Sequence, residues 1–251
     1  VGTLHVRPVL NMKSDKDIKN MKSISQEAFE MVKKYKGSHS GEHGDGIVRS
    51  EFHEMMFGKK ITNAFEEIKD TFDSKNLLNP GKIVRPFKSN DRSLMRYKSG
   101  YQTEKINTHY DWSNWGQFSD AIEMCNNNGA CRKLDSGVMC PSYRVTKEEK
   151  DLVRGRANTL RLALSNQLPE GSFVSKEMYE TMELCVSCKA CQRECPMSVD
   201  MAKMKSEFLS HYYRKFSMRI KDRIISDMPK LIWLYKIVNP IINKIKNYPL
   251  I

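Results

Sequence analysis

The chain has 251 residues, of which 39% are hydrophobic and 29% are charged, and its formal net charge at pH 7 is +12. This balance is typical of a folded globular protein and excludes an intrinsically disordered one, which would contain fewer apolar residues. No apolar run reaches the roughly 20 residues that a membrane-spanning helix needs. The length allows one large domain or two modest ones.

The first 88 residues contain no cysteine and are predicted to combine helices with strands. At their start, Leu4 and Val6 alternate with His5 and Arg7, a period of two that is typical of a β-strand. Successive side chains of a strand point to opposite faces, so His5 and Arg7 are expected to lie on the same side. This segment is the predicted strand component of an α+β fold.

Two helices are predicted to follow this strand. Apolar residues recur at intervals of three and four over residues 15–36, and the same pattern returns after Gly58. The turn Asn79-Pro80-Gly81 is expected to end the second helix, because proline and glycine favour turns. Residues 89–118 are polar and irregular and are predicted to be a linker.

The remainder of the chain is predicted to be helical. One helix is expected over Thr146–Gln167, where Thr146 and Glu149 have the spacing of a capping box. An amphipathic helix is expected further on, because large apolar residues recur at steps of four. These residues are Phe208, Tyr212, Phe216, Ile220 and Ile224.

Basic residues are concentrated at the end of the chain. Residues 196–251 contain 11 Lys or Arg and 4 Asp or Glu, which gives +7 of the net +12. Such a tail can meet phosphate, anionic lipid or an acidic partner, although a solvated face is an equally simple explanation. The apolar stripe of its amphipathic helix is expected to pack on a neighbouring domain, and the alternative is a peripheral contact with the inner face of the cytoplasmic membrane. No aromatic–basic recognition pattern accompanies the charge, so no nucleic-acid partner is expected.

The cysteines carry the strongest pattern in the sequence, and all seven lie between Cys125 and Cys195. An odd, clustered set argues against a disulfide framework and for metal or redox chemistry. The run Cys185-x2-Cys188-x2-Cys191-x3-Cys195-Pro196 has the spacing of a bacterial ferredoxin-type iron–sulfur site. In such runs the cysteine before proline binds a second cluster.

That rule requires a second group of cysteines, and Cys125-x5-Cys131-x8-Cys140-Pro141 provides one with the same Cys-Pro ending. Exchange of the two Cys-Pro residues between the groups then gives the expected ligands of two clusters. One set is Cys185, Cys188, Cys191 and Cys140, and the other is Cys125, Cys131 and Cys195.

Asn128 occupies the position where a fourth cysteine of the second set would be expected. Three thiolates suit a three-iron cluster, or a four-iron cluster whose last iron is bound by water or another side chain. Both forms stay open, and loss of one thiolate charge should raise the reduction potential. The alternative for all seven cysteines is structural zinc, which usually pairs two Cys-x2-Cys groups a dozen or more residues apart. The closely spaced cysteines and the repeated Cys-Pro favour iron–sulfur.

A glycine-rich segment, GSHSGEHGDG at residues 37–46, is the second informative stretch. Its glycines allow the backbone to come close to a flat or anionic ligand. Glu42 and His43 can each serve a metal ion or a proton transfer. The segment lacks the dinucleotide-binding fingerprint, and taken alone it also fits an ordinary polar loop.

Taken together, these stretches resemble the FAD-linked 2-hydroxy-acid dehydrogenases of the vanillyl-alcohol-oxidase type. The resemblance is to the bacterial subgroup in which the flavin domains are fused to an α-helical ferredoxin domain, a subgroup that includes D-2-hydroxyglutarate dehydrogenases. The matching segments keep the family order from residue 1 to about 210. They are VGTLHVRP at 1–8, SGEHGDG at 40–46, LLNPGKI at 77–83, EMCNNNGACR at 123–132, MCPSY at 139–143, RGRAN at 154–158 and the Cys185 run.

The resemblance implies roles for residues at matching positions. His5 and Glu42 match ligands of a divalent metal ion (zinc, manganese or iron) beside the flavin, and the family's other histidine ligand would precede residue 1. His43 matches the proposed catalytic base. Arg7 is expected to pair with the substrate carboxylate, for which a guanidinium is well shaped, or to form a structural ion pair. His39 matches no family position and is expected to be a surface or hydrogen-bonded histidine.

The resemblance also implies the cofactor contacts and the domain organisation. Ser40, Gly41, Gly44 and Asn79 match positions near FAD, which would be bound mostly by an upstream domain. The expected organisation is a partial FAD-linked oxidase C-terminal (cap) domain at residues 1–88, a linker at 89–118, an all-α two-cluster ferredoxin domain at 119–212 and a basic helical tail at 213–251. An internal fragment of this kind is expected to be inactive by itself.

The implied activity is oxidation of a D-2-hydroxy acid of the 2-hydroxyglutarate, lactate or glycolate type. The flavin takes the hydride, the metal ion polarises the hydroxyl and His43 takes the proton. Two clusters would relay the electrons singly to a quinone or an electron-transfer protein, in the cytoplasm or at the membrane surface. The alternatives are an iron–sulfur electron-transfer subunit that docks a separate flavoprotein, and a zinc-containing nucleic-acid binder.

Overall fold

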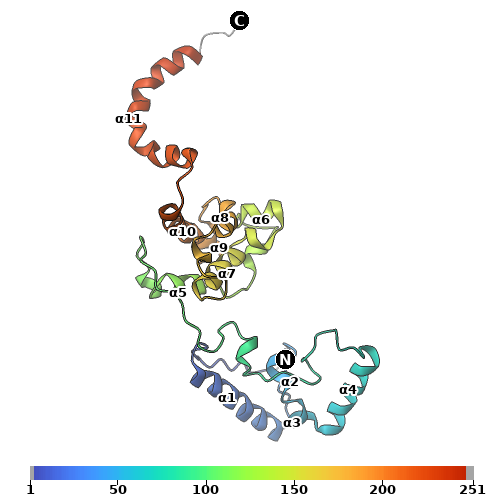
Figure 1. Ribbon diagram of the computed structural model, residues 1–251. Helices are drawn as coiled ribbons and strands as arrows, with labels where there is room; N and C mark the ends of the chain where they lie inside the picture. The colour runs from blue at the N-terminus through green and yellow to red at the C-terminus, as the bar shows by residue number, and fades with distance from the viewer. Residues whose placement is uncertain (1–2, 247–251) are drawn as a thin grey trace. The chain divides into compact units, whose positions relative to one another are not determined.

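The computed structural model describes residues 3–246 (Figure 1). The chain divides into two compact units, Val1–Gln102 (unit 1) and Thr103–Ile251 (unit 2). The first two residues of the expected flavin-domain segment and the last five of the expected basic tail lie outside the described residues.

The expected α+β fold of residues 1–88 is wrong, because the residues described contain helices and no strand. The segment 3–11 has no regular secondary structure, and Leu4 and Val6 are 90% and 73% exposed. A strand needs a neighbour to accept its backbone hydrogen bonds, and no extended segment pairs with this one within residues 3–246. The alternating residues Leu4 and Val6 therefore do not form a strand.

Unit 1 is built from short helices around a small core. Its first helix begins after Ser14, whose side chain accepts a hydrogen bond from the Asp17 amide. The last long helix ends at Phe72, before the Asn79-Pro80-Gly81 turn, because the carboxylate of Asp73 accepts the amides of Leu77 and Leu78. The elements are α1 (Asp15–Lys34), α2 (Gly46–Ser50), α3 (His53–Phe57), α4 (Lys59–Phe72) and the 3₁₀ turn η1 (Arg92–Leu94).

Unit 2 holds most of the buried apolar residues of the chain. Helices α5, α7, α8 and α10 pack around a core in which Leu160, Leu164 and Phe208 are fully buried. The α-helices are α5 (Phe118–Glu123), α6 (Pro141–Thr146), α7 (Val153–Leu164), α8 (Lys176–Glu183), α9 (Ala190–Glu194), α10 (Met201–Lys215) and α11 (Ile220–Lys246). The 3₁₀ turns are η2 (Ser113–Trp115), η3 (Ala130–Arg132), η4 (Glu149–Asp151) and η5 (Ser172–Val174).

The predicted helix over Thr146–Gln167 is interrupted at its start. Thr146 ends α6, because Lys147 adopts a left-handed conformation with φ of 61°, and α7 begins only at Val153. The predicted capping box is therefore wrong, and Glu149 instead forms an ion pair with Arg154.

The predicted helix with apolar residues at steps of four is also two helices. α10 ends at Lys215 and α11 begins at Ile220, with Phe216 in an extended conformation between them. α11 contains Pro229 and Pro240, and many of its apolar side chains are exposed. Among the described residues, no helix combines the length and the apolar character that crossing a membrane requires.

A buried carboxylate ties the beginning of unit 2 to α10. Glu207 has no exposed surface, and its two oxygens accept from the amides of His109 and Tyr110 at 2.9 and 3.0 Å. The Trp112 indole and His211 Nε2 also face this carboxylate, at 3.0 and 3.2 Å. Burial by itself would raise the pKa of Glu207, but the surrounding hydrogen bonds outweigh it and lower that pKa.

Candidate functional site

A cavity in unit 2 is lined by cysteines from two distant segments of the chain. Cys140 comes from the residue before α6, and Cys185, Cys188 and Cys191 come from the run around α9. These four are the cysteines that the sequence assigned to one cluster. Four thiols around one hollow provide the ligand number that a four-iron cluster takes.

Two helix N-termini close the cavity. The Val153 amide at the start of α7 hydrogen-bonds to the Cys140 sulfur, and the Met201 and Ala202 amides at the start of α10 do the same for Cys191. These amides and the helix dipoles favour negative charge, so they suit thiolates that share an iron cluster.

Without iron, these thiols would hold their protons. Burial raises the pKa of Cys140 to about 12 and the pKa of Cys191 to about 11, against partial opposition from the helix amides. Iron binding would therefore displace protons from the cavity, as it does wherever a cluster takes buried thiols as ligands.

Glu194 holds the two cysteine segments together. Its carboxylate accepts from the amides of Val138 and Met139 at 2.9 and 3.0 Å, just before Cys140. Gly137 allows this approach, because it has φ of 76° and a Cβ there would lie 2.4 Å from the Glu194 Oε2 atom. The loop that delivers Cys140 is therefore fixed to the residue that precedes Cys195.

Two cationic side chains lie at or beside the cavity. Arg156 lines it, is 1% exposed, and donates to the Thr181 and Asp151 carbonyls at 2.9 and 2.7 Å. Lys205 donates to the Cys185 carbonyl at 2.6 Å, and burial lowers the pKa of its amino group. Positive charge at this place would counter the negative charge of a cluster with four thiolates.

Cys125 and Cys131 form a second pair of buried thiols. Burial raises the pKa of Cys131, a negative charge on Cys125 raises it further, and the Arg154 amide opposes both effects. Both cysteines belong to the same buried core cluster as Cys140 and Cys191. Cys195 is half-buried, and its assignment to this pair rests on the sequence spacing.

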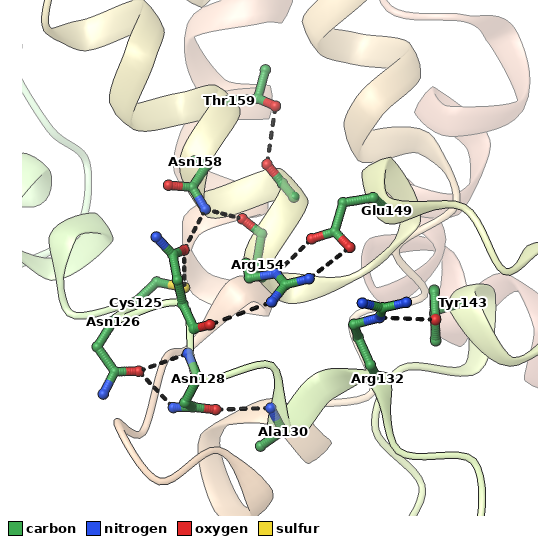
Figure 2. Close-up of polar contacts among 12 residues, drawn as sticks. Cys125, Asn126, Asn128, Ala130, Arg132, Tyr143, Glu149, Arg154, Asn158 and Thr159 are labelled. Carbon is green, nitrogen blue, oxygen red and sulfur yellow. Dashed lines mark hydrogen bonds and ion pairs between the residues drawn. The ribbon is translucent and has the colours of Figure 1, made fainter. Parts of the chain in front are cut away.

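The turn between Cys125 and Cys131 is held by asparagine side chains (Figure 2). The Asn128 amide group donates to Asn126 at 2.6 Å, and its oxygen accepts from the Ala130 amide at 2.8 Å. Both polar ends of Asn128 are thus engaged within the turn that precedes η3. The structure shows Asn128 as a turn-forming residue, and the three-iron or four-iron form of the cluster stays a prediction.

Arg154 fixes this turn to α7. Its guanidinium pairs with both oxygens of Glu149 at 2.6 and 2.9 Å and donates to the Asn127 carbonyl at 3.3 Å (Figure 2). Asn158, one turn further along α7, donates to the Asn127 side chain at 2.7 Å. Sequence reasoning did not find these contacts, although the RGRAN segment that carries Arg154 and Asn158 was among the matching stretches.

In unit 1, the structure brings His5, Glu42 and His43 together. One Glu42 oxygen lies 2.9 Å from His5 Nε2 and 3.5 Å from His43 Nε2, and the two imidazole rings are 5.4 Å apart. The three side chains are 42–59% exposed, and their ligand atoms lie within 4.8 Å of one another. Gly41 allows this arrangement, because a Cβ there would lie 2.6 Å from the Thr3 hydroxyl oxygen.

Comparison with known proteins assigns both units. Residues 1–83 match the C-terminal domain of FAD-linked oxidases, and residues 121–199 match the 4Fe-4S dicluster domain. The chain thus combines a FAD-linked oxidase C-terminal domain with a 4Fe-4S dicluster domain. The recognition of both parts from sequence motifs is confirmed.

The relatives of this chain include bacterial D-2-hydroxyglutarate dehydrogenases. The chain is 32% identical over 260 residues to the Haemophilus influenzae enzyme and 30% identical over 260 residues to the Escherichia coli enzyme. Each match covers 90% of the chain and 25% of the relative. The chain is also similar to glycolate oxidase subunit GlcD of Bacillus subtilis, 30% identical over 82 residues, or 33% of the chain and 17% of that subunit. The chain spans about a quarter of the length of the dehydrogenases. No solved structure matches it.

The other predicted residues of the FAD-linked oxidase domain lie on its surface or in its turns. Arg7 is exposed in the irregular segment 3–11. Asn79 is exposed, has φ of 48°, and accepts from Lys82 at 3.3 Å. Gly44 has φ of 71° with open space beside it, and the Ser40 side chain hydrogen-bonds to Asp45. The structure brings neither Arg7 nor Asn79 into the His5–Glu42–His43 group.

The prediction that His39 lies at the surface is wrong, because His39 is 7% exposed. Neither of its ring nitrogens makes a hydrogen bond of normal geometry among the described residues, although the Arg49 backbone acts on the ring. Its Nε2 lies 3.8 Å from Asp45 Oδ1, and His53 Nε2 lies 2.8 Å from Asp45 Oδ2. Burial lowers the pKa of His39, and the Asp45 carboxylate only partly offsets this. Sequence reasoning missed Asp45 and His53, although three ligand-type residues lie within fifteen positions.

Proposed function

We propose that this chain is the cluster-bearing part of a FAD-dependent dehydrogenase for 2-hydroxy acids, and that unit 2 carries electrons from the flavin to an acceptor. The observation that carries the proposal is the cavity lined by Cys140, Cys185, Cys188 and Cys191. The two helix N-termini at this cavity and the dicluster match of the same residues support a cluster there.

The chain's own residues suit the electron relay. Cys140 and the Cys185 run would hold a four-iron cluster, whose chemistry is one-electron transfer. Cys125, Cys131 and Cys195 would hold the second cluster, in a three-iron or a four-iron form. The amides of Val153 and Arg154 would stabilise thiolate charge at both sites.

The residues of unit 1 suit the substrate side of the reaction. FAD would accept the hydride. Most of its contacts are expected from residues other than those of this chain. The residues of this chain expected near it are Ser40, Gly41, Gly44 and Asn79. His5 and Glu42 would hold a divalent ion (zinc, manganese or iron), and their 2.9 Å contact supports a shared ligand role.

The proposal also assigns roles to His43 and Arg7 and names the substrate, the acceptor and the cellular setting. His43 lies 3.5 Å from Glu42 and would take the hydroxyl proton of the substrate. Arg7 would bind the substrate carboxylate. The substrate would be a D-2-hydroxy acid of the 2-hydroxyglutarate, lactate or glycolate type, and the acceptor a quinone or an electron-transfer protein. The setting would be the cytoplasm, with peripheral contact of the basic tail at the membrane.

The test compares two matched substitutions, Cys140→Ala and Cys195→Ala, in protein purified without oxygen. Iron, acid-labile sulfide and EPR spectra before and after dithionite reduction are measured. About seven to eight irons are expected in the unaltered chain. Loss of Cys140 should remove the four-cysteine cluster and spare the other, and loss of Cys195 should do the reverse.

Other outcomes would count against the proposal in distinct ways. If Cys140→Ala abolished the signal of the three-cysteine cluster, the exchange of Cys-Pro residues between clusters would be wrong. Stoichiometric zinc with little iron would remove the electron relay altogether. Recovery of a separate flavin-containing chain with this one would favour an electron-transfer subunit that docks a flavoprotein.

A further inference from the structure

Unit 1 contains a second group of metal-ligand side chains, which is buried. His39, Asp45 and His53 each offer one ligand atom, and these atoms lie within 4.8 Å of one another. His39 and His53 are 7% and 3% exposed, whereas the His5–Glu42–His43 group is open to solvent. Aromatic rings surround the histidines, with centroids 5.2–6.2 Å from theirs: Phe29, Phe57 and Phe65.

His39 is the first sign that a ligand is missing from this group. Its side chain has no exposed surface, yet neither ring nitrogen makes a hydrogen bond of normal geometry, and neither does Asp45 Oδ1 on the side that faces it. The Arg49 backbone acts on the ring only weakly. Buried polar atoms in native proteins are nearly always hydrogen-bonded, and an exception points to an absent water or ion. Three such atoms in one small apolar space make a local cause more plausible than chance.

His53 is the second sign. Its Nδ1 lies 3.2 Å from the Ile83 carbonyl oxygen, and its Nε2 lies 2.8 Å from Asp45 Oδ2. Both neighbours are acceptors, and a neutral imidazole has only one N–H to donate. In either neutral tautomer, one ring lone pair therefore faces an oxygen lone pair. A second proton on the ring would remove this repulsion, and so would a cation between Nε2 and Asp45.

We propose that His39, Asp45 and His53 bind a divalent transition-metal ion of the zinc type. Two imidazoles and one carboxylate are a common ligand set for such ions, with the fourth position left to water or another ligand. Tetrahedral ligands about 2.0–2.1 Å from zinc lie about 3.3 Å from one another. The separations of 3.8 and 2.8 Å to the two Asp45 oxygens lie on either side of that value.

The surrounding contacts match a bound ion as well. With the metal on Nε2, the Nδ1–H of His53 donates to the Ile83 carbonyl, which is the usual outer contact of a metal-bound histidine. Zinc would also neutralise the carboxylate of Asp45 in a largely apolar environment.

The ion would stabilise the loop that carries the predicted substrate-side residues. Glu42 and His43 lie in the sequence between His39 and Asp45, so one ion would fix both ends of that loop. His53 begins α3 and would attach the loop to the helical part of unit 1. This site is separate from the one proposed at His5 and Glu42, and it does not depend on the proposed dehydrogenase activity.

The test uses the full chain with its clusters in place, stripped of loosely bound metal by a chelator and then titrated with zinc sulfate. Zinc is counted by mass spectrometry, and its ligands are identified by X-ray absorption at the zinc edge. One zinc is expected at the His39–Asp45–His53 group, in addition to any zinc bound at His5 and Glu42, with nitrogen and oxygen ligands at about 2.0–2.1 Å. Zinc taken up by free cysteines would instead show sulfur at about 2.3 Å.

Matched variants locate the ion. His39→Leu and Asp45→Asn should each weaken zinc binding by at least about 100-fold, because loss of an outer contact alone costs 10- to 100-fold. Glu42→Gln should leave this zinc in place, because it alters only the exposed group. His39→Leu should also melt at or above the temperature of the wild type in chelator, since it removes an unpaired buried imidazole.

Three results would overturn the proposal. These are zinc bound through sulfur alone, zinc that Glu42→Gln removes and His39→Leu retains, and no zinc bound by the wild type. The last result would mean that His53 and Asp45 pair without a metal ion. The absorption measurement on Glu42→Gln excludes the exposed group, so failure of His39→Leu or Asp45→Asn to fold still leaves a decisive result.

Discussion

The replacement Glu207→Gln tests how a single buried carboxylate holds unit 2 together. The side chains have nearly the same shape, but glutamine has one acceptor oxygen where glutamate has two. Four donors converge on the carboxylate at 2.9–3.2 Å, two on each oxygen. Glutamine would therefore leave two buried donors without an acceptor and turn its own N–H groups toward them.

Each buried donor left unpaired costs about 1–3 kcal/mol, so the loss of two should cost about 2–6 kcal/mol. Since about 1.4 kcal/mol is a factor of ten, the open state of this region should become roughly 30-fold to 20,000-fold more populated. Stability of a domain is usually only about 5–15 kcal/mol, so the effect would be large.

Hydrogen exchange measured by mass spectrometry on the cluster-loaded chain gives the required local resolution. Peptides that contain His109 and Tyr110, and peptides from α10, should lose protection in Glu207→Gln. Glu170→Gln serves as the control, because Glu170 is exposed. Unchanged protection at His109 and Tyr110 would refute the reasoning, because their amides bond directly to Glu207.

Acidification should affect only the chain that keeps the carboxylate. The folded pKa of Glu207 lies below its ordinary value of 4.5, so its stabilisation is complete above that pH. It is lost as the pH falls through the folded pKa, and glutamine has no such dependence. Protection at Tyr110 should therefore stay constant down to about pH 4.5 and fall below that pH in the wild type alone, over times in which the cluster absorbance is constant.

Two further substitutions address the cysteine sites. Gly137→Ala should speed loss of the cluster absorbance under a chelator, because the new Cβ would displace Glu194. Gly171→Ala is the control: it shares the left-handed backbone cost of about 1–2 kcal/mol, but its new Cβ has nothing within 4 Å. Equal rates in the two variants would contradict the role of Glu194. Arg154→Met should lower the reduction potential of the cluster bound by Cys125 and Cys131, because it removes a nearby positive charge. Potentiometric EPR titration measures this shift, and an equal shift in Arg223→Met, in the exposed part of α11, would show that it is nonspecific.

The two cysteine segments could be assigned from the sequence because metal ligation imposes fixed spacings on the chain. The spacing of the Cys185 run required a partner from elsewhere, and Cys140 lines the same cavity as that run. The helix amides at Val153 and Met201 could not be foreseen, because they depend on how α7 and α10 are packed.

The errors of sequence reasoning have physical causes as well. Alternation at Leu4 and Val6 indicates a strand only where another strand can pair with it. The capping box at Thr146 failed because the left-handed Lys147 ended α6 at that position. His39 was misjudged because burial depends on the tertiary contacts of its loop, which no local pattern encodes.

The start of α7 has a consequence for how the two cysteine groups behave together. Val153 hydrogen-bonds to Cys140 and the next residue, Arg154, to Cys131, so neighbouring peptide units of one helix meet both groups. The separation of the two groups is therefore set by a stretch of rigid backbone, whatever happens to the surface loops. Charge added at one group would act on the peptide unit next to the one that stabilises the other, so two clusters bound there would have coupled reduction potentials.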